Sequence, residues 1–109
     1  MSINGGWLVV LVTCSSRDEA SKIARSVIGE KLAACVNIVE GIHSTYWWKG
    51  TIEEDEETLL IIKTRAEKFE KLVERIKELH SYTVPEIIAL PIVMGNKDYL
   101  NWLDETIRQ

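Results

Sequence analysis

The chain has 109 residues, of which 46% are hydrophobic and 28% are charged, and its formal net charge is -4. This length corresponds to one domain spanning residues 1–109, and the composition is that of an ordinary soluble globular protein. Non-specific binding to nucleic acid or to anionic membranes needs a basic surface, so an acidic chain predicts neither partner.

The N-terminal apolar run is confined to residues 7–12 and follows no basic leader. It is far too short to span a bilayer. We therefore expect a cytoplasmic protein. The two cysteines, Cys14 and Cys35, lack the close spacing of a zinc ribbon, and in a reducing compartment they are expected to be free thiols.

The first half of the chain predicts a strand, a helix and a long strand. The continuous apolar run of residues 7–13 is typical of a strand buried on both faces. Ser16 and Glu19 form a capping box that predicts the start of a helix. Residues 34–48 predict a long strand with a bulge at Gly41. The apolar stripe of the helix comprises Ala20, Ile23, Ala24, Val27, Ile28 and Leu32.

The second half begins with a reversal at Lys49-Gly50 and a returning strand over residues 57–64. Thr64 and Glu67 predict a second capping box, and residues 80–85 form a connection because Pro85 cannot continue a helix. The apolar stripe of this second helix comprises Phe69, Leu72, Val73, Ile76 and Leu79.

The last two predicted elements are a strand over residues 86–93 and a helix capped by Asn96. Pro91 places the strand at an edge or a bulge of the sheet, because proline cannot donate a ladder hydrogen bond. The helix is predicted to bury Tyr99, Leu100, Leu103 and Ile107 on one side.

The predicted order β-α-β-β-α-β with an extra C-terminal helix indicates an α+β, ferredoxin-like fold, with an antiparallel sheet and two helices on one face. The strands over residues 7–13 and 57–64 are nevertheless apolar on both faces. The short third helix cannot cover a whole sheet. We therefore expect another copy of the chain to cover the second face, because most soluble oligomers are homo-oligomers.

Tyr46, Trp47 and Trp48 follow one another in the long predicted strand. Neighbouring side chains of a strand point to opposite faces, so Tyr46 and Trp48 share one face and Trp47 lies on the other. We expect the aromatic side chains on one face to pack within their own subunit and those on the other face to contact a neighbouring subunit. The double tryptophan therefore indicates subunit assembly more than a ligand-binding or catalytic role.

An ordered set of short segments between residues 8 and 103 resembles the CutA family of divalent-cation tolerance proteins. The resemblance implies a homotrimer in which long hairpins cross between subunits. It also implies tolerance of copper and other divalent ions, with copper as a candidate ligand. The segments are VTCSSRDEA, EKLAACVNI, YWWKG, LLIIKT, VPEIIALP and DYLNWL.

Cys14 and His80 are the candidate metal ligands. Cys14 precedes a predicted helix N-terminus, where a thiol is expected to have a lowered pKa and to bind soft metals. It is followed by Ser15 where the family often has proline. His80 begins a segment in which Ser81 and Thr83 depart from the family's His-Pro-Tyr-Glu. The alternative for His80 is a bond to the last carbonyls of its helix.

Other polar or reactive residues have plainer interpretations. Cys35 is predicted to be a small buried hydrophobe, and His43 a surface or interface residue. Asn37 must be hydrogen-bonded if it lies in a core, and an interface or pocket role is open. The acidic run of residues 53–57 lacks the calcium-loop pattern and is predicted to be a solvated hairpin end.

The main alternative function is a small-molecule sensor like the P-II signalling proteins, which bind ligands in clefts between subunits. A cleft lined by Trp48, Lys63, Arg65 and Tyr82 could hold an anion. No phosphate-binding loop and no set of nucleophile, base and acid can be assembled, so catalysis is not expected. A purely structural scaffold is a further alternative. RNA binding is rejected because the predicted central strand lacks aromatic residues and the chain is acidic.

Overall fold

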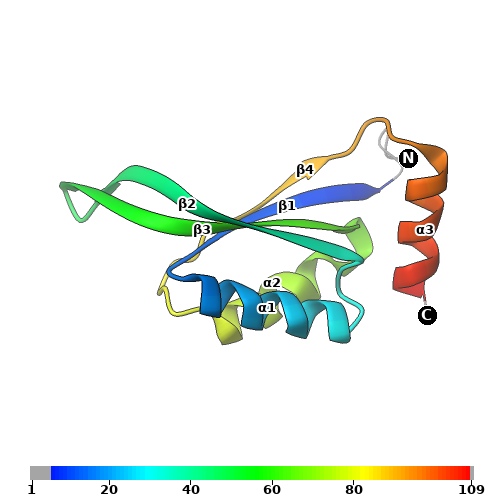
Figure 1. The fold of residues 1–109 in the computed structure, drawn as a ribbon, viewed down its shortest axis with the longest axis horizontal. Coiled ribbons are helices and arrows are strands. Elements are labelled where there is room, and N and C mark those ends of the chain that lie inside the picture. Colours follow the sequence, from blue (N-terminus) through cyan, green and yellow to red (C-terminus); the bar gives the residue numbers. More distant parts are fainter. Residues whose placement is uncertain (1–5, 109) are drawn as a thin grey trace.

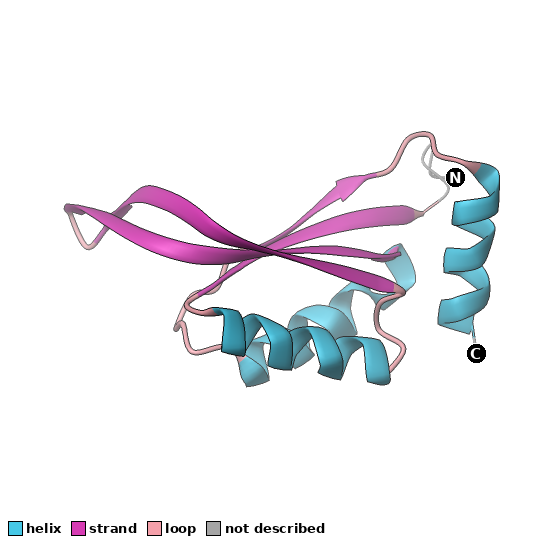
Figure 2. Cartoon of the chain, viewed as in Figure 1, coloured by secondary structure: helices cyan, strands magenta, loops and turns pink. Residues whose placement is uncertain are grey.

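The computed structural model describes residues 6–108, which form a four-stranded antiparallel sheet and three α-helices (Figures 1 and 2). The sheet order is β2-β3-β1-β4. The elements are β1 (Trp7–Cys14), α1 (Arg17–Gly29), β2 (Cys35–Trp48), β3 (Thr51–Arg65), the 3-10 turn η1 (Ala66–Lys68), α2 (Phe69–Leu79), β4 (Ile87–Pro91) and α3 (Lys97–Arg108). The predicted α+β class and the predicted order of elements along the chain are confirmed.

Helices α1 and α2 cover one face of the sheet, and α3 packs at one end (Figure 1). Alternate residues of β1 and β3 point toward the two helices and are fully buried. This core joins Val10, Val12, Leu60 and Ile62 of the sheet to Ile23 and Val27 of α1 and to Leu72 and Ile76 of α2.

The opposite face of the sheet has no helix over it, and we call it the open face (Figure 1). Its residues are cross-strand partners, which point to the same side of a sheet. They are half-buried or exposed and mostly apolar: Val9 and Leu11 of β1, Asn37 and Val39 of β2, Leu59, Ile61 and Lys63 of β3, and Ile88 and Leu90 of β4. Within one chain, the helices therefore bury one face of the sheet, and the open face stays at least partly exposed.

Strands β2 and β3 form a hairpin that projects beyond the helices (Figure 1). Trp48 pairs with Thr51, and the two loop residues Lys49 and Gly50 have φ of 51° and 80°. Positive φ at both positions is the signature of a type I′ hairpin turn. The predicted reversal at Lys49-Gly50 is confirmed, and so is the bulge at Gly41, where the register shifts.

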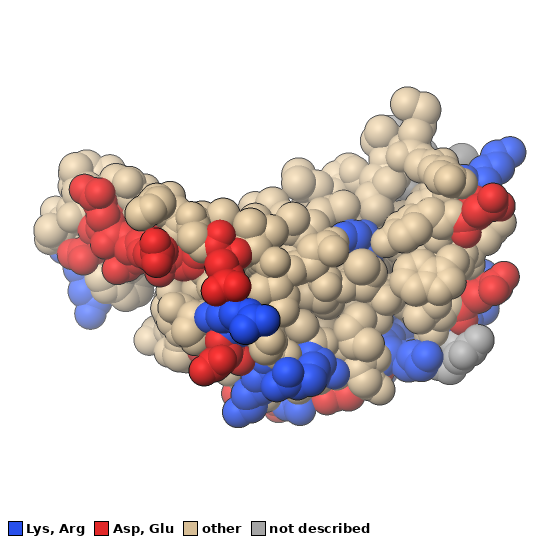
Figure 3. All heavy atoms as spheres, viewed as in Figure 1, with Lys and Arg blue, Asp and Glu red and all other residues tan. Residues whose placement is uncertain are grey.

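The acidic run of residues 53–57 lies on the β2–β3 hairpin as predicted, but it is part of β3, so the expected start of that strand at residue 57 is wrong. The register explains the difference, because these residues pair continuously with residues 42–46 of β2. Most of the run is exposed, and its carboxylates gather along the hairpin in Figure 3.

The predicted capping box at Thr64 is also wrong. Thr64 is a buried residue of β3, and its hydroxyl donates to the Leu32 carbonyl oxygen at 2.7 Å. The hydroxyl therefore joins β3 to the loop after α1 instead of capping a helix. The extended Arg65 precedes η1 and makes no side-chain capping bond there.

Four smaller expectations need correction. Helix α1 ends at Gly29, so the buried Leu32 lies beyond it. Ile28, placed in the buried stripe, is exposed. The fourth strand is shorter than expected, although it lies at the predicted edge. Asn96 caps α3 by accepting the Asp98 N–H at 2.9 Å, but Tyr99 remains 40% exposed.

Helix α3 is attached to the end of the sheet by Asp104. One oxygen of Asp104 accepts the indole N–H of Trp7 at 2.9 Å and a guanidinium N–H of Arg65 at 3.1 Å. Leu103 and Ile107 pack with Ala34 against Trp7.

Within residues 6–108, no helix has both the length and the apolar character needed to cross a membrane. The expected absence of a basic leader concerns residues 1–5, which lie outside the described residues.

Candidate metal centre

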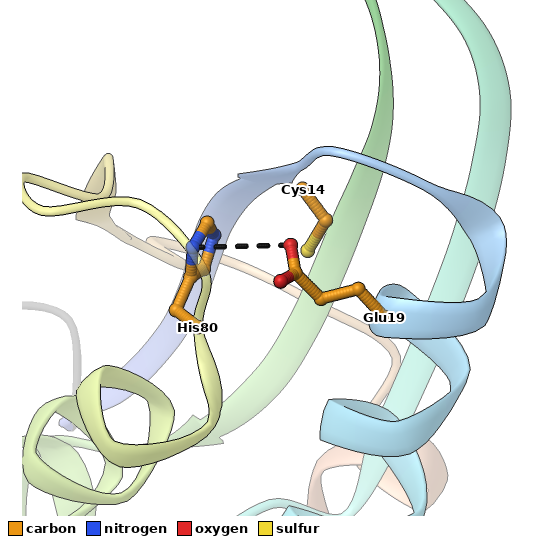
Figure 4. A group of neighbouring side chains, drawn as sticks. All are labelled: Cys14, Glu19 and His80. Carbon is orange, nitrogen blue, oxygen red and sulfur yellow. Dashed lines mark ion pairs between the residues drawn. The ribbon is translucent and has the colours of Figure 1, made fainter.

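Three side chains from three elements converge beneath one end of the sheet (Figure 4). Cys14 is the last residue of β1, Glu19 lies in the first turn of α1, and His80 follows the last residue of α2. One ligand atom from each side chain lies within 4.8 Å of the others. We call these three residues the metal centre. The fold thus brings together the two ligands predicted from the sequence, Cys14 and His80, and adds Glu19.

Glu19 is held by the helix start and by the turn that follows α2. Its N–H donates to the hydroxyl of Ser16, the N-cap, at 3.2 Å. Its carboxylate accepts the Ser15 N–H at 3.1 Å and the Ser81 N–H at 2.8 Å. The predicted capping residue is correct, but the carboxylate bonds to Ser15 rather than to Ser16.

The pKa of Glu19 is set by opposing influences. Burial acts to raise it, but the hydrogen bonds from Ser81 and Ser15, together with the nearby His80, outweigh burial and lower the pKa below its usual value. Glu19 is therefore an anion at neutral pH.

The imidazole of His80 is fully buried, and both of its nitrogens are engaged. Nε2 lies 2.7 Å from the Thr13 carbonyl oxygen, which can only accept, so Nε2 is the protonated nitrogen. Nδ1 accepts the Tyr82 N–H at 3.0 Å. The carbonyl bond predicted as the alternative therefore exists, but to β1 and not to the last turn of α2.

A metal ligand needs a lone pair, and the lone pair of His80 is on Nδ1. Nδ1 lies 3.9 Å from a carboxylate oxygen of Glu19, and the Nε2–H bond to Thr13 fixes the ring. Buried metal-binding histidines use the same arrangement, with the second nitrogen held by a carbonyl. A cation at Nδ1 would replace the hydrogen bond from the Tyr82 N–H.

The expected lowering of the Cys14 pKa is wrong. Its thiol is fully buried, and its pKa is raised to about 12 by burial first and by the charges of Glu19 and Glu57 second. The expected lowering by the helix N-terminus is absent because that end is capped by Ser16 and is surrounded by carboxylates. The thiol is therefore protonated at neutral pH and must lose its proton to bind a metal.

The donor set consists of one sulfur, one imidazole nitrogen and one carboxylate. Thiolate and imidazole are ligands of zinc and of copper, and three protein ligands leave a coordination position for water. The donors have the types that such an ion requires, and their ligand atoms, which lie within 4.8 Å of one another, would have to move closer together around an ion with bonds of about 2.0–2.3 Å. Hard ions such as Mg²⁺ and Ca²⁺ favour all-oxygen sites and fit this set poorly.

The predicted interface and cleft residues fall in three places. Tyr46, Trp48 and Tyr82 line one cavity, whereas Trp47 does not. Asn37 and Lys63 are hydrogen-bonded to each other on the open face. Arg65 lies at the far end of the sheet beside Asp104. Within one chain, Lys63 and Arg65 therefore do not line a cleft with Trp48 and Tyr82.

Two remaining candidates take no part in the metal centre. Cys35 is only half-buried, not fully buried as predicted, and pairs with Lys63 across the sheet. His43 is exposed, as predicted, and lies 3.7 Å from a carboxylate oxygen of Glu56.

Glu19 is the candidate ligand that the sequence did not predict, because it was interpreted only as a capping residue. A positional signal existed. Only two residues separate the end of β1 from the start of α1, so a side chain in the first turn of α1 lies close to the end of β1 and to Cys14. The role of Ser81 and Tyr82 as donors to Glu19 and His80 had no sequence signal, since their backbone N–H groups make those bonds.

Comparisons with known proteins agree over nearly the whole chain. Residues 8–106 match the family model described as CutA1 divalent ion tolerance protein. The divalent-cation tolerance protein CutA of Thermus thermophilus is 56% identical over 97 residues, which covers 89% of this chain and 94% of that protein. A solved structure of the divalent cation tolerance protein from the same organism has a TM-score of 0.90 at 54% identity and covers 92% of this chain and 97% of that chain.

A longer relative is Protein CutA 1, chloroplastic, of Oryza sativa subsp. japonica. It is 52% identical over 102 residues, which is 94% of this chain but only 58% of the rice protein. The chain therefore spans little more than half of that relative.

Proposed function

Because the chain belongs to the CutA1 divalent ion tolerance protein family, we propose that it serves tolerance of divalent metal ions by binding them without catalytic turnover. The single observation that supports binding is the convergence of Cys14, Glu19 and His80 within 4.8 Å. Copper and zinc are the ions that suit this donor set best.

Binding at the metal centre is coupled to local rearrangement. The Cys14 thiol loses its proton, and the His80 Nδ1 exchanges the Tyr82 N–H for the ion. Glu19 contributes a negative charge that offsets the charge of the ion. Because the Tyr82 N–H occupies the lone pair of His80 Nδ1, an ion bound there would require that hydrogen bond to open, while the Ser81 N–H bond to Glu19 could remain.

We also propose that the chain is a single domain that acts as a cytoplasmic homotrimer. The apolar open face supports association with other copies, because about 25 cal/mol is gained for each Å² of apolar surface removed from water. The number three comes from the family resemblance. The cytoplasmic location rests on the sequence alone.

The test is titration with Zn²⁺, and with Cu⁺ without oxygen, followed by calorimetry. Cys14→Ser is expected to weaken binding at least tenfold, and His80→Gln to have a similar effect. Cys35→Ser is the matched control, because it removes the other thiol outside the metal centre. Equal affinities for wild type and for a Cys14→Ala, His80→Ala double variant would instead favour the scaffold alternative.

The pH dependence gives a second readout. Because the pKa of Cys14 is raised to about 12, one proton leaves the thiol for each ion bound throughout the neutral range. The apparent affinity of the wild type is therefore expected to rise about tenfold per pH unit. In Cys14→Ser, the slope of log affinity against pH should decrease by about one, because one fewer proton is released for each ion bound. An unchanged slope would mean that the ion binds elsewhere.

The alternative of an anion sensor like the P-II proteins is not favoured. The cavity that contains Trp48 and Tyr82 is lined by Glu57 and Glu86, and its lining within the described residues includes neither lysine nor arginine.

A further inference from the structure

A cavity of about 820 Å³ lies between the projecting β2–β3 hairpin, from residue 43 to Trp48, and the segment of residues 81–86. This volume is within the range of pockets that hold small organic ligands. Cys14, Glu19 and His80 are not among the residues that line it. The cavity is therefore separate from the metal centre, although Ser81 and Tyr82 belong to the turn that closes that centre.

Three aromatic rings line this cavity, from Tyr46 and Trp48 of β2 and from Tyr82 after α2. Aromatic faces carry negative electrostatic potential and attract cations. The ring of Trp48 already has a cation nearby, since the Lys49 ammonium lies 5.7 Å from its centroid. Each tyrosine hydroxyl donates to a carboxylate, Tyr46 to Asp55 and Tyr82 to Glu57. Such bonds make the rings richer in electrons.

Two carboxylates, Glu57 and Glu86, also line the cavity. Glu57 is only 8% exposed and accepts the Tyr82 hydroxyl at 2.7 Å. None of the ion pairs found among residues 6–108 involves Glu57, and neither lysine nor arginine is part of the described lining. A buried carboxylate without a cationic partner favours a positively charged ligand.

The neighbouring Tyr46 responds to this negative charge. The hydrogen bond to Asp55 first, and then burial and further carboxylates, raise the pKa of Tyr46 to about 12. The phenol of Tyr46 therefore stays neutral at physiological pH, and the negative charge in this region comes from the carboxylates.

We propose that this cavity binds a small organic cation, a protonated alkylamine or a quaternary ammonium, between the rings of Tyr46, Trp48 and Tyr82 and beside Glu57 and Glu86. The rings contact the alkyl groups and the positive charge, and the carboxylates provide the counter-charge. A bare divalent ion fits this lining less well, because aromatic faces supply no ligand atoms.

The experiment uses butylammonium, butyltrimethylammonium, butan-1-ol and butyrate with the full chain in its native assembly. Binding is followed by amide chemical shifts and by tryptophan fluorescence. Both cations are expected to bind with shifts confined to the cavity, and the alcohol and the anion are expected to bind at least tenfold more weakly. A higher affinity for butylammonium than for butyltrimethylammonium would support the assigned role of the carboxylates, because only butylammonium can donate hydrogen bonds to them.

Matched variants make the proposal specific. Trp48→Leu is expected to weaken cation binding about threefold or more. Trp102→Leu should leave it unchanged, because Trp102 is equally exposed (44% against 45%) but lies on α3 outside the cavity. Glu57→Gln preserves the shape of the side chain and an acceptor for the Tyr82 hydroxyl, and it should weaken the binding of both cations. Cys14→Ser should not change cation binding, which separates this site from metal binding.

The proposal is overturned by absence of cation binding at millimolar concentration, which includes the case of a cavity filled by a neighbouring copy. It is also overturned if butan-1-ol or butyrate binds as well as the cations. Equal affinities for wild type, Trp48→Leu and Glu57→Gln would place the cation at another site and would likewise contradict it.

Discussion

At the scale of single residues, Glu19 connects parts of the chain that are distant in sequence. Its carboxylate receives hydrogen bonds from Ser15 at the start of α1 and from Ser81 after α2. The same side chain belongs to the cluster proposed to bind a metal and raises the pKa of Cys14. One carboxylate therefore affects local stability and the protonation of the thiol, and under the proposed function it also affects metal affinity.

Glu19→Gln is expected to lower the free energy of unfolding at pH 7 by about 1–3 kcal/mol, because one carboxylate acceptor becomes an amide donor facing an N–H group. The folded-state pKa of Glu19 is lowered, so its contribution is present above its ordinary pKa and is lost as pH falls through the folded value. Denaturant unfolding should show a constant difference between the variants from pH 5 to about pH 7 and a shrinking difference below about pH 4.5.

Glu70→Gln provides the control, since Glu70 is an exposed residue of α2. It should change stability by less than about 0.5 kcal/mol at every pH. A difference between wild type and Glu19→Gln that does not change between pH 3 and pH 7 would contradict the role assigned to the ionised carboxylate.

At the scale of elements, α3 joins the sheet through a small core cluster and one polar junction. Its buried residues Leu103 and Ile107 pack with Ala34 and Trp7 in that cluster. The Trp7 indole and the Arg65 guanidinium share one oxygen of Asp104, and the guanidinium also lies 5.4 Å from the Trp7 ring. This junction orients the helix, which apolar contacts alone would leave free to slide.

Asp104→Asn is therefore expected to loosen α3 before the rest of the fold. It removes the charge that pairs with Arg65, at a cost of about 1–3 kcal/mol. Hydrogen exchange of residues 100–108 should accelerate, whereas the amides of β1 and β3 should keep their protection. Glu105→Gln, an exposed neighbour in the same helix, should leave exchange unaltered. Uniform acceleration across the sheet would show that α3 does not unfold separately.

At the scale of the whole molecule, the two faces of the sheet differ. Helices α1 and α2 bury one face, and the open face carries apolar side chains from all four strands, with Asn37 and Lys63 as a polar pair among them. An apolar surface of this kind commonly marks an interaction site. The polar pair would fix the register of an assembly, because it must remain hydrogen-bonded when covered.

Ile61→Glu is expected to prevent the proposed assembly by placing a charge at the centre of the open face. Light scattering should give three times the 12.4 kDa of one chain for the wild type and a single chain's mass for the variant. Ile28→Glu is the control, because Ile28 is an exposed residue of α1 on the opposite side of the sheet. A wild-type monomer at micromolar concentration would contradict the proposal for the open face.

The sequence by itself determined the elements and their order, because their signals are local. Periodicity located the strands and helices, Ser16 and Asn96 marked helix starts, and Lys49-Gly50 marked the turn. Cys14 and His80 were also selected from the chain as candidate ligands, and they stay a prediction. Element ends were less predictable: the polar residues 53–57 gave no strand signal, although pairing with β2 extends β3 through them.

Only the tertiary structure decided what the candidate ligands do. It buried Cys14 and placed it beside two carboxylates, and these influences outweigh the expected effect of the helix N-terminus and reverse the direction of the pKa shift. It also added Glu19 to the metal centre and assembled three aromatic residues and two glutamates into one cavity. The physical reason is that burial and electrostatic potential depend on distances between side chains far apart in sequence, such as Cys14 and His80, and no local pattern encodes those distances.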